Sequence, residues 1–329
     1  MSINGFQGHL KASFQESFGT ANVASLQAIS IVNESIVYEI EVLEEQSLSG
    51  RLEGADIHQG FHSITGGIES EVSPDVLVYF LQSVIGKGYT TGSGPYTHTF
   101  KTDKSDFDGL SATTPLTFEV YRGGEAGIYS DMCGDQLEFK ISSNELMTAS
   151  MGIVGGSFTT SNNTSPTYRA APPFTWNQTS CSFQGVAITD IDDMTINISN
   201  NLEAVHTLQT SGSPQKIKRT AQQRVTVSGN MLFQVDSYWE AFRTAEEGPM
   251  VINFASTANS FKIDMPKFKF TGYAPLIDGT DIIGASFEGV ASFQQSSLSA
   301  VAFTVVNSYA GADYSYPELS FTLEARLWA

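Results

Sequence analysis

Two stretches that lie far apart in this chain repeat one order of apolar, polar and small side chains. The first, LEFKISSNELMTASMGIVGGSF, spans residues 137–158 and alternates Leu137 and Phe139 with polar residues before a polar turn and a run of small residues. The second, MPKFKFTGYAPLIDGTDIIGASFEGVASF, spans residues 265–293 and follows the same order from Phe268 onward. A period of two is typical of a strand with one buried face. The recurrence favours β units of similar design in both halves.

The same alternation marks strand candidates along most of the chain, with almost no long helical pattern between them. In the first half they are 36–43, 67–72, 116–121, 137–141 and 148–154. In the second half they are 194–199, 224–228, 250–254, 268–271 and 284–292, with two tail strands expected at 300–306 and 319–327. The chain is therefore predicted to be mainly β.

One short helix is predicted in the first half. In SPDVLVYFLQSVIG, Ser73 is a suitable N-cap, Pro74 occupies the first helical position and Gly86 ends the helix. The apolar residues that share one face are Val76, Leu77, Phe80, Leu81 and Val84.

A second helix is predicted at the matching place in the other half. In VDSYWEAFRTAEEG, Asp236 is the predicted N-cap and Gly248 the predicted stop. Trp239 and Phe242 are expected to face inward. Both halves then run strand, long polar loop, strand, helix, strand, strand, turn, strand. We interpret this order as an internal duplication of one small β-sandwich or barrel unit.

A polar, proline-bearing stretch separates the halves. It reads TTSNNTSPTYRAAPP, a composition typical of a linker or a loop between units. We place the junction near Tyr168. The predicted organisation is a first unit with an N-terminal arm at 1–168 and a second unit with C-terminal strands at 169–329.

The charge balance argues against one class of function. The 329 residues include 17 basic and 35 acidic ones, a formal net charge of −18. A nucleic-acid reader needs a basic face that neutralises phosphates. A protein that binds nucleic acid by recognising it is therefore not expected. The simplest role of the acidic surface is to keep the protein soluble.

Signals for a membrane or for secretion are not apparent. No apolar run approaches the roughly 20 residues of a membrane helix, and MSINGFQGHLKASFQESFG lacks the basic start and apolar core of a secretory signal. Cys133 and Cys181 fit a reducing compartment and suggest no disulfide framework. We expect the protein to be made in a cytoplasm.

Catalytic and cofactor motifs are mostly absent. His58 and His62 have a ligand spacing for a helix, but the glycines around them favour loop or strand. DKSDFDG, residues 103–109, fails as a calcium loop because Lys104 and Pro115 would take its first and last ligand positions. No triad, acid–base pair or cofactor box is found. An enzyme, a bound metal and a cofactor are therefore not expected.

Four patterned segments, considered together, resemble one known family. They are YSDMCGDQLEFKISSNELMTASMGIVGGSF, MTINISNNLE, QQRVTVSGNMLFQVDSYWEAFR and SGRLEGADIHQGFHSITGGIESEVSPDVLVYFLQSVIG. The family is that of the tail tube (major tail) proteins of long-tailed bacteriophages. The resemblance covers most of residues 30–293 and lies in the pattern, whereas residues 1–22 and 294–329 carry no matching pattern.

This resemblance implies a structural role in the virion tail. In that family, β units form a ring whose sheets close around a channel, and rings stack head to tail into a tube that conducts DNA during genome ejection. Members with one unit per chain form hexameric rings. Two units per chain suggest a trimer with pseudo-six-fold symmetry, with a hexamer of the whole chain as the alternative. The implied partners are further copies of the chain, a tape-measure protein, and tail terminator and distal tail proteins, with DNA only in transit and assembly in the host cytoplasm.

Alternation also predicts which side chains line such a channel. The predicted lumen-facing residues are all polar: Glu39, Glu41, Glu69 and Glu71, with Asn197, Ser199, Thr226 and Ser228 as the matching positions of the second unit. Carboxylates there would repel DNA phosphates, whereas a wall of cations would hold DNA at every ring. The alternative is an ordinary solvated sheet face.

A basic cluster lies in the long polar loop of the second unit. The segment NNLEAVHTLQTSGSPQKIKRTAQQRV, residues 200–225, is far longer than an ordinary hairpin connection and contains Lys216, Lys218 and Arg219. The resemblance implies that this loop reaches the neighbouring ring, where the three cations would pair with carboxylates. Candidate partners are Asp190, Asp192 and Asp193. The alternative is a solvated basic turn.

Two other classes of function stay open on the sequence alone. One is a tube or spike component of a contractile injection system. The other is a β-sandwich receptor or glycan-binding module, in which Trp176, Tyr273 and the C-terminal tyrosines would form an aromatic platform. Tubes or stackable rings in negative-stain microscopy would favour the tube functions over the binding module.

Overall fold

The computed structural model describes residues 5–45, 56–86, 88–101, 115–162, 165–169, 171–209, 211–233, 237–276 and 284–310. Four sequence predictions lie outside the described residues. They are the calcium-like segment 103–109, the N-cap Asp236, the tail strand 319–327, and the tyrosines Tyr314 and Tyr316 of the aromatic platform.

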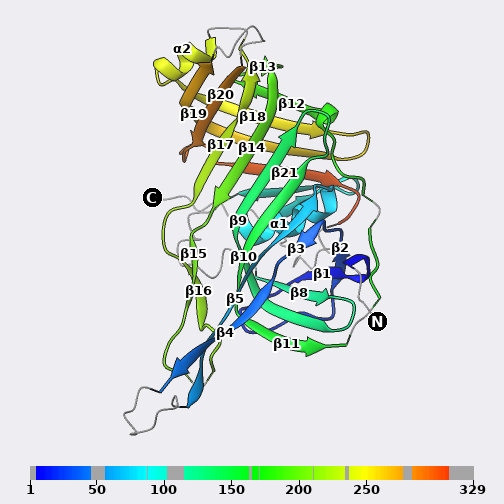
Figure 1. The fold of residues 1–329 in the computed structure, drawn as a ribbon. Helices are drawn as coiled ribbons and strands as arrows, with labels where there is room; N and C mark the ends of the chain where they lie inside the picture. The colour runs from blue at the N-terminus through cyan, green and yellow to red at the C-terminus, as the bar shows by residue number, and fades with distance from the viewer. Residues whose placement is uncertain are drawn as a thin grey trace, which may run out of the picture.

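Every other strand candidate overlaps a strand, and the chain is mainly β as predicted (Figure 1). The first half contains β1 His9–Phe14, β2 Gln27–Ile29, β3 Asn33–Glu34, β4 Val37–Glu44, β5 Ile57–Glu71, β6 Tyr89–Thr91, β7 Tyr96–Lys101, β8 Leu116–Tyr121, β9 Ala126–Ser142, β10 Thr148–Gly155 and β11 Ser157–Ser161. The second half contains β12 Thr179–Phe183, β13 Val186–Ile188, β14 Ile191–Ser199, β15 Leu202–Val205, β16 Lys216–Arg219, β17 Arg224–Leu232, β18 Glu247–Ala255, β19 Ser260–Leu276, β20 Gly284–Ala291 and β21 Ala302–Asn307. Short 3-10 helices lie at Gly5–Gln7 and Trp176–Gln178.

Helix α1, Pro74–Ile85, has the predicted caps. The Ser73 hydroxyl accepts a hydrogen bond from the Val76 N–H at 3.4 Å, and Gly86 ends the helix with a φ of 117°. All residues of α1 are buried, including those outside the predicted apolar face. The reason is that β1, β7, β9 and β21 all contact the helix.

Helix α2, Ser237–Arg243, differs from the prediction in two respects. It ends at Arg243, and the predicted stop Gly248 lies in β18. The buried face is made by Tyr238, Ala241 and Phe242, at the i, i+3 and i+4 spacing of one helix face. Trp239 lies beside this face and is 40% exposed, so the prediction that it faces inward is wrong.

One antiparallel run of strands joins the two halves in the order β4–β5–β10–β9–β14–β17–β20–β19. The order within the first half, β4–β5–β10–β9, matches β14–β17–β20–β19 in the second. The halves meet at the β9–β14 pair, where Phe139 lies opposite Ile196. They are thus joined by direct strand pairing as well as by the connecting segment.

A single hydrophobic core extends through both halves. The ring of Phe139 in β9 lies 5.6 Å from that of Phe261 in β19 and 6.3 Å from that of Phe303 in β21, centroid to centroid. Strand β21 also pairs with β7 of the first half, with Val305 opposite His98. The predicted junction near Tyr168 therefore separates two stretches of chain that share one core.

The long polar segment of the second half is not a loop throughout. Strands β15 and β16 form a hairpin within it, with Ala204 opposite Ile217. Ile217 is buried, although most of its neighbours in sequence are polar. Cys133 and Cys181 are both buried.

Candidate functional site

A continuous polar surface covers one side of the strand run from β5 to β20. One row of its side chains consists of Glu69, Ser150, Glu138, Asn197 and Thr226, each opposite the next on the neighbouring strand. A parallel row consists of Glu71, Thr148, Lys140, Thr195, Ser228 and Glu288. We call the residues of these two rows the polar face.

The other side of the same strands is buried and mainly apolar. A row of buried residues runs across it: Ile68, Met151, Leu137, Ile198 and Val225. Because side chains alternate along a strand, burial of this row in the core fixes the polar face outward. The register therefore sets which side chains the surface presents.

Six of the predicted lumen residues lie together on this side of the sheet. Glu69 and Glu71 come from β5, Asn197 from β14, and Thr226 and Ser228 from β17, all within the two rows. Ser199 continues the surface, opposite Gln136.

Glu39 and Glu41 lie farther along, on β4. Glu39 is opposite Ser63, which alternation places on the same side of β5 as Glu69. A bulge between Ile40 and Val42 follows. The predicted residues thus come from both halves, and the pairing of β9 with β14 joins the two contributions.

The charges on the polar face include one close ion pair. Lys140 Nζ lies 2.9 Å from Glu138 Oε1. This hydrogen bond, the charge of Glu138 and the charge of Glu69 raise the pKa of Lys140. The cation in the centre of the face is therefore neutralised locally by Glu138 of its own strand and by the charge of Glu69 on β5.

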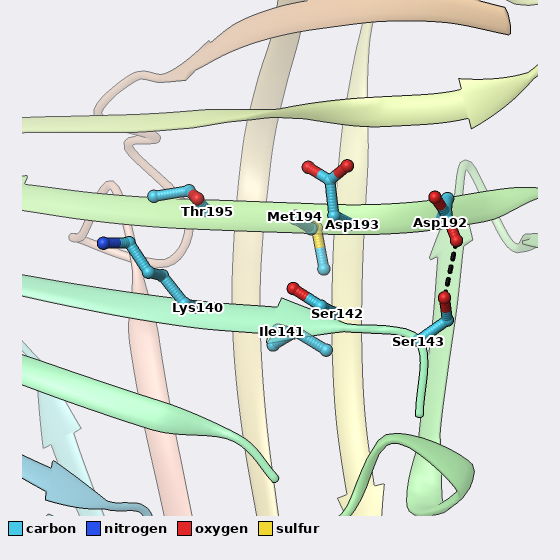
Figure 2. A pocket seen from close by; sticks show the side chains of 8 residues that line it. All are labelled: Lys140, Ile141, Ser142, Ser143, Asp192, Asp193, Met194 and Thr195. Atoms are coloured by element: carbon cyan, nitrogen blue, oxygen red, sulfur yellow. Dashed lines mark hydrogen bonds between the residues drawn. The ribbon is translucent and has the colours of Figure 1, made fainter. Parts of the chain in front are cut away.

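A shallow hollow of about 350 Å³ lies at one end of the β9–β14 pair (Figure 2). Asp192 Oδ1 accepts a hydrogen bond from the Ser143 hydroxyl at 2.6 Å, and Asp193 Oδ2 accepts one from Asn230 Nδ2 at 2.8 Å. Both carboxylates have partners within the chain. Over the described part of the chain, no group of three or more His, Cys, Asp or Glu side chains is placed to hold a metal ion.

The predicted basic cluster lies on β16. Lys216 and Lys218 carry like charges close to one another, and the charge of Lys218 is the main cause of a lowered pKa of Lys216. Arg219 points differently, since its Nη2 donates to the buried Asn200 Oδ1 at 2.9 Å. The structure does not bring the three cations to the predicted partners Asp190, Asp192 and Asp193 within one chain.

Hairpin β15–β16 lies beside the β4–β5 hairpin. The His62 N–H donates to the Gly212 carbonyl at 2.8 Å, and the rings of Phe61 and His206 stack with centroids 4.4 Å apart. We call β4, residues 57–63 of β5, and β15–β16 the finger; it projects at the lower end of Figure 1. His58 and His62 therefore lie on a strand of the finger and not on a helix.

The finger exposes apolar side chains that the sequence had not singled out. They are Val37, Ile40, Val42, Leu43, Ile57 and Phe61. In β4 the alternation of apolar and acidic residues is clear in sequence, but it predicts a buried apolar side. The exposure arises because β4 pairs with β5 alone among the described strands.

Among the described residues, Trp176 and Tyr273 do not form the aromatic platform of a binding module. Tyr273 is only 5% exposed and lies beneath Trp239 and Phe233. Trp176 is exposed, but it lies in the 3-10 helix Trp176–Gln178 that precedes β12. The tyrosines after residue 310 lie outside the described residues.

Two glycines relate the halves by the same local geometry. A Cβ on Gly66 of β5 would lie 2.4 Å from the Ser35 carbonyl oxygen, and one on Gly229 of β17 would lie 2.2 Å from the Asp193 carbonyl oxygen. Only glycine permits such an approach of neighbouring backbones. Gly66 comes two residues after Ile64, and Gly229 comes two residues after Val227. Ile64 and Val227 are both buried, and each pairs with a residue of the preceding strand.

These partners define matching positions. Ile64 lies opposite Tyr38, and Val227 lies opposite Ile196. With these two pairs superposed, Glu39 and Glu41 take the places of Asn197 and Ser199. Thr226 and Ser228 take the places of Ser63 and Thr65, whereas the sequence prediction set them beside Glu69 and Glu71. The alternation alone could not fix this correspondence, because a shift by an even number of residues leaves each side chain on the same face.

The comparison with protein families matches almost the whole length of this fold. A profile of the family described as phage tail tube protein matches residues 5–291. A comparison with curated proteins gives no match. No helix among the described residues is long and apolar enough to cross a membrane. The chain belongs to the phage tail tube proteins and is a structural protein of the virion tail.

Proposed function

We propose that three copies of this chain form a ring with pseudo-six-fold symmetry, and that stacked rings form the channel through which DNA leaves the virion. The observation that carries this proposal is the polar face, in which one row of polar side chains runs from β5 of the first half to Glu288 of β20 in the second. A surface of this kind, polar across neighbouring strands and backed by one core, suits the inner wall of a tube.

The internal duplication belongs to the same proposal. The matching strand order of the two halves and the matching glycine contacts at Gly66 and Gly229 support it. Two units per chain make a ring of three chains equivalent to a ring of six units.

Stacking of the rings would use the finger. The exposed apolar residues on its β5 strand, Ile57 and Phe61, and the cations Lys216 and Lys218 are available to contact the next ring. Individual exposed ion pairs contribute only about 0.2–1 kcal/mol, so the apolar residues are expected to supply the larger share. A tape-measure protein would fill the lumen before ejection, and tail terminator and distal tail proteins would bound the tube.

Native mass measurement with negative-stain microscopy tests the proposal. The expected species is a ring of three chains, each of 35.6 kDa, and hollow tubes built from such rings. A ring of six chains would replace the trimer and overturn the symmetry argument. A monodisperse monomer at high concentration, with no tubes of this protein in virions, would overturn the function.

A further inference from the structure

The β9–β14 pair, where the two halves meet, shows how two units can join by strand pairing. In it, β9 and β14 run antiparallel with Gln136 opposite Ser199, Leu137 opposite Ile198 and Phe139 opposite Ile196. Ile196 and Ile198 are 0% exposed there. The edge strand β9 of the first run and the edge strand β14 of the second therefore form an ordinary antiparallel pair with a closed core beneath it.

Strand β4 occupies in the first unit the place that β14 occupies in the second. The matching glycines put Tyr38 at the position of Ile196 and Ile40 at the position of Ile198. Glu41 then corresponds to Ser199.

Strand β19 likewise corresponds to β9. Met151 of β10 lies opposite both Ile68 and Leu137, and Ala285 of β20 lies opposite both Met231 and Pro275. Ile68 and Met231 each stand two residues after a matching glycine. Pro275 therefore corresponds to Leu137, and the preceding Ala274 corresponds to Gln136.

Both of these counterpart strands have an open edge. Within the described residues, β4 pairs only with β5, and 271–276 of β19 pair only with β20. The exposure of β4 fits a missing neighbour: Ile40 is 38% exposed, whereas its counterpart Ile198 is 0% exposed. An exposed, apolar strand edge is a template for pairing with another chain.

We propose that β4 of one copy pairs antiparallel with 271–276 of β19 in the next copy, in the register of the β9–β14 junction. Glu41 then lies opposite Ala274, and Ile40 lies opposite Pro275. This inference rests on the proposed ring and adds to it which edges meet and which residues face each other. Internal and external junctions then alternate with one geometry, so three chains close the ring and extend the polar face around it.

The residues along the edges of β4 and of 271–276 in β19 suit a contact that forms between chains that have already folded. Pro275 has no N–H, so it cannot donate a hydrogen bond to a neighbouring strand. The external junction therefore relies more on the burial of Tyr38 and Ile40 than the internal one does. The proline on the β19 edge and the glutamates on the β4 edge also disfavour pairing with an unrelated strand.

Engineered disulfides test the register. Glu41→Cys combined with Ala274→Cys should link chains in assembled rings, giving dimers and closed trimers on a non-reducing gel that revert to monomer with reductant. Paired residues of adjacent strands fall within the roughly 4.4–6.8 Å Cα separation of a disulfide. The native thiols should not compete, because both are buried and burial raises the pKa of Cys181 to about 12.

Two matched pairs control this experiment. Gln136→Cys with Ser199→Cys occupies the same register inside one chain and should form a disulfide without raising the molecular mass. Glu44→Cys with Ala274→Cys stands three residues out of register, about 10 Å along the strand, and should give at least tenfold less linked product. If wild-type tubes form while Glu41→Cys with Ala274→Cys stays monomeric under conditions that oxidise the internal pair, the proposed register is wrong and the tube function stands. If the wild-type protein forms neither rings nor tubes, the proposed function itself fails.

A second variant tests the same pairing without introducing cysteines, so that the test does not depend on how the cysteine pair affects folding. Ile40 is exposed in the single chain, so Ile40→Asp should leave the melting temperature of the monomer nearly unchanged while reducing ring formation at least tenfold. Val186→Asp, at a site that is also exposed but lies on β13, should form rings normally. Normal ring formation by Ile40→Asp would overturn the proposal.

Discussion

Asn200 occupies the point where the two halves and the finger meet. Its Nδ2 donates to the carbonyls of Val84 at 2.7 Å and Gly134 at 2.9 Å, at the end of α1 and in β9. Its Oδ1 accepts from Arg219 Nη2 and Gln223 Nε2, each at 2.9 Å. A fully buried amide with all four of these bonds holds the base of hairpin β15–β16 against the first half.

Loss of that amide should destabilise the protein. We expect Asn200→Ala to lower the free energy of unfolding by about 1–3 kcal/mol, because buried polar groups lose their partners. Asn230→Ala is the matched control, since Asn230 is exposed and makes one side-chain bond, to Asp193; it should change stability by less than about 0.5 kcal/mol. Urea unfolding of both variants measures the difference. Equal stabilities would show that the network contributes nothing.

His98 gives the stability a defined pH dependence. It is fully buried; Nε2 donates to Asn307 Oδ1 at 3.0 Å and to the Tyr309 carbonyl at 3.1 Å, while Nδ1 accepts from the Thr90 hydroxyl at 2.9 Å. Burial lowers its pKa below 6.5. The unfolded chain therefore takes up a proton first, so stability falls as the pH drops below about 6.5 and levels off beneath the folded pKa.

Melting curves between pH 7.5 and 5 check this sign. The wild-type protein should lose stability toward pH 5, and His98→Asn should show a flatter dependence, even if its stability at pH 7.5 is lower. His58→Gln is the control, because His58 is exposed on the finger; its pH dependence should match the wild type. An unchanged slope in His98→Asn would refute the assignment.

At the scale of elements, the sequence predicted the strands where one face is buried and the other is solvated. Strands β10, β14 and β17 alternate cleanly, and their candidates were found. The first part of β9 was missed because residues 126–134 are buried on both sides, which removes the alternation. Hairpin β15–β16 was missed because polar residues dominate its segment and hide the short alternation around Ile217.

The sequence predicted several of the side chains on the polar face, but it did not predict which of them lie next to one another across the sheet. Alternation alone separated Glu69 from Ile68. The neighbours of Glu69 across the sheet depend on the β9–β14 pairing, a contact between distant segments that no local pattern reports. The same limit explains why Glu138 and Lys140 were absent from the predicted set.

The polar face makes a prediction about ejection. Glu69→Lys with Glu71→Lys should leave tubes intact but slow DNA release several-fold, because each cation captures phosphates and adds a log-salt slope of about 0.9. Release of DNA from triggered virions, followed with an intercalating dye, measures the rate, and raising the salt should restore it. Glu16→Lys with Glu125→Lys makes the same charge change at exposed turns away from this face and should release DNA normally. A normal rate in the first variant would place the channel wall elsewhere.

At the scale of the molecule, strand pairing and packing join the two halves as closely as they join each half internally. The β9–β14 pair, the β7–β21 pair and the aromatic contacts of Phe139 all cross between residues 1–168 and 169–329. Separating the halves would expose this core and open the edges of β9 and β14. We therefore expect the two halves to unfold as one cooperative unit.

Calorimetry distinguishes one cooperative unit from two independent domains. We expect a single unfolding transition whose calorimetric and van't Hoff enthalpies agree. Leu81→Ala in α1 and Ile263→Ala in β19 remove side chains that are 0% exposed, at a cost of about 2–5 kcal/mol each. In one cooperative unit, either substitution lowers the temperature of the whole transition, and residues 169–329 expressed alone do not give a cooperative melt. Two transitions, with each substitution moving only the one that belongs to its own half, would show that the halves fold independently and that the shared core contributes little to either.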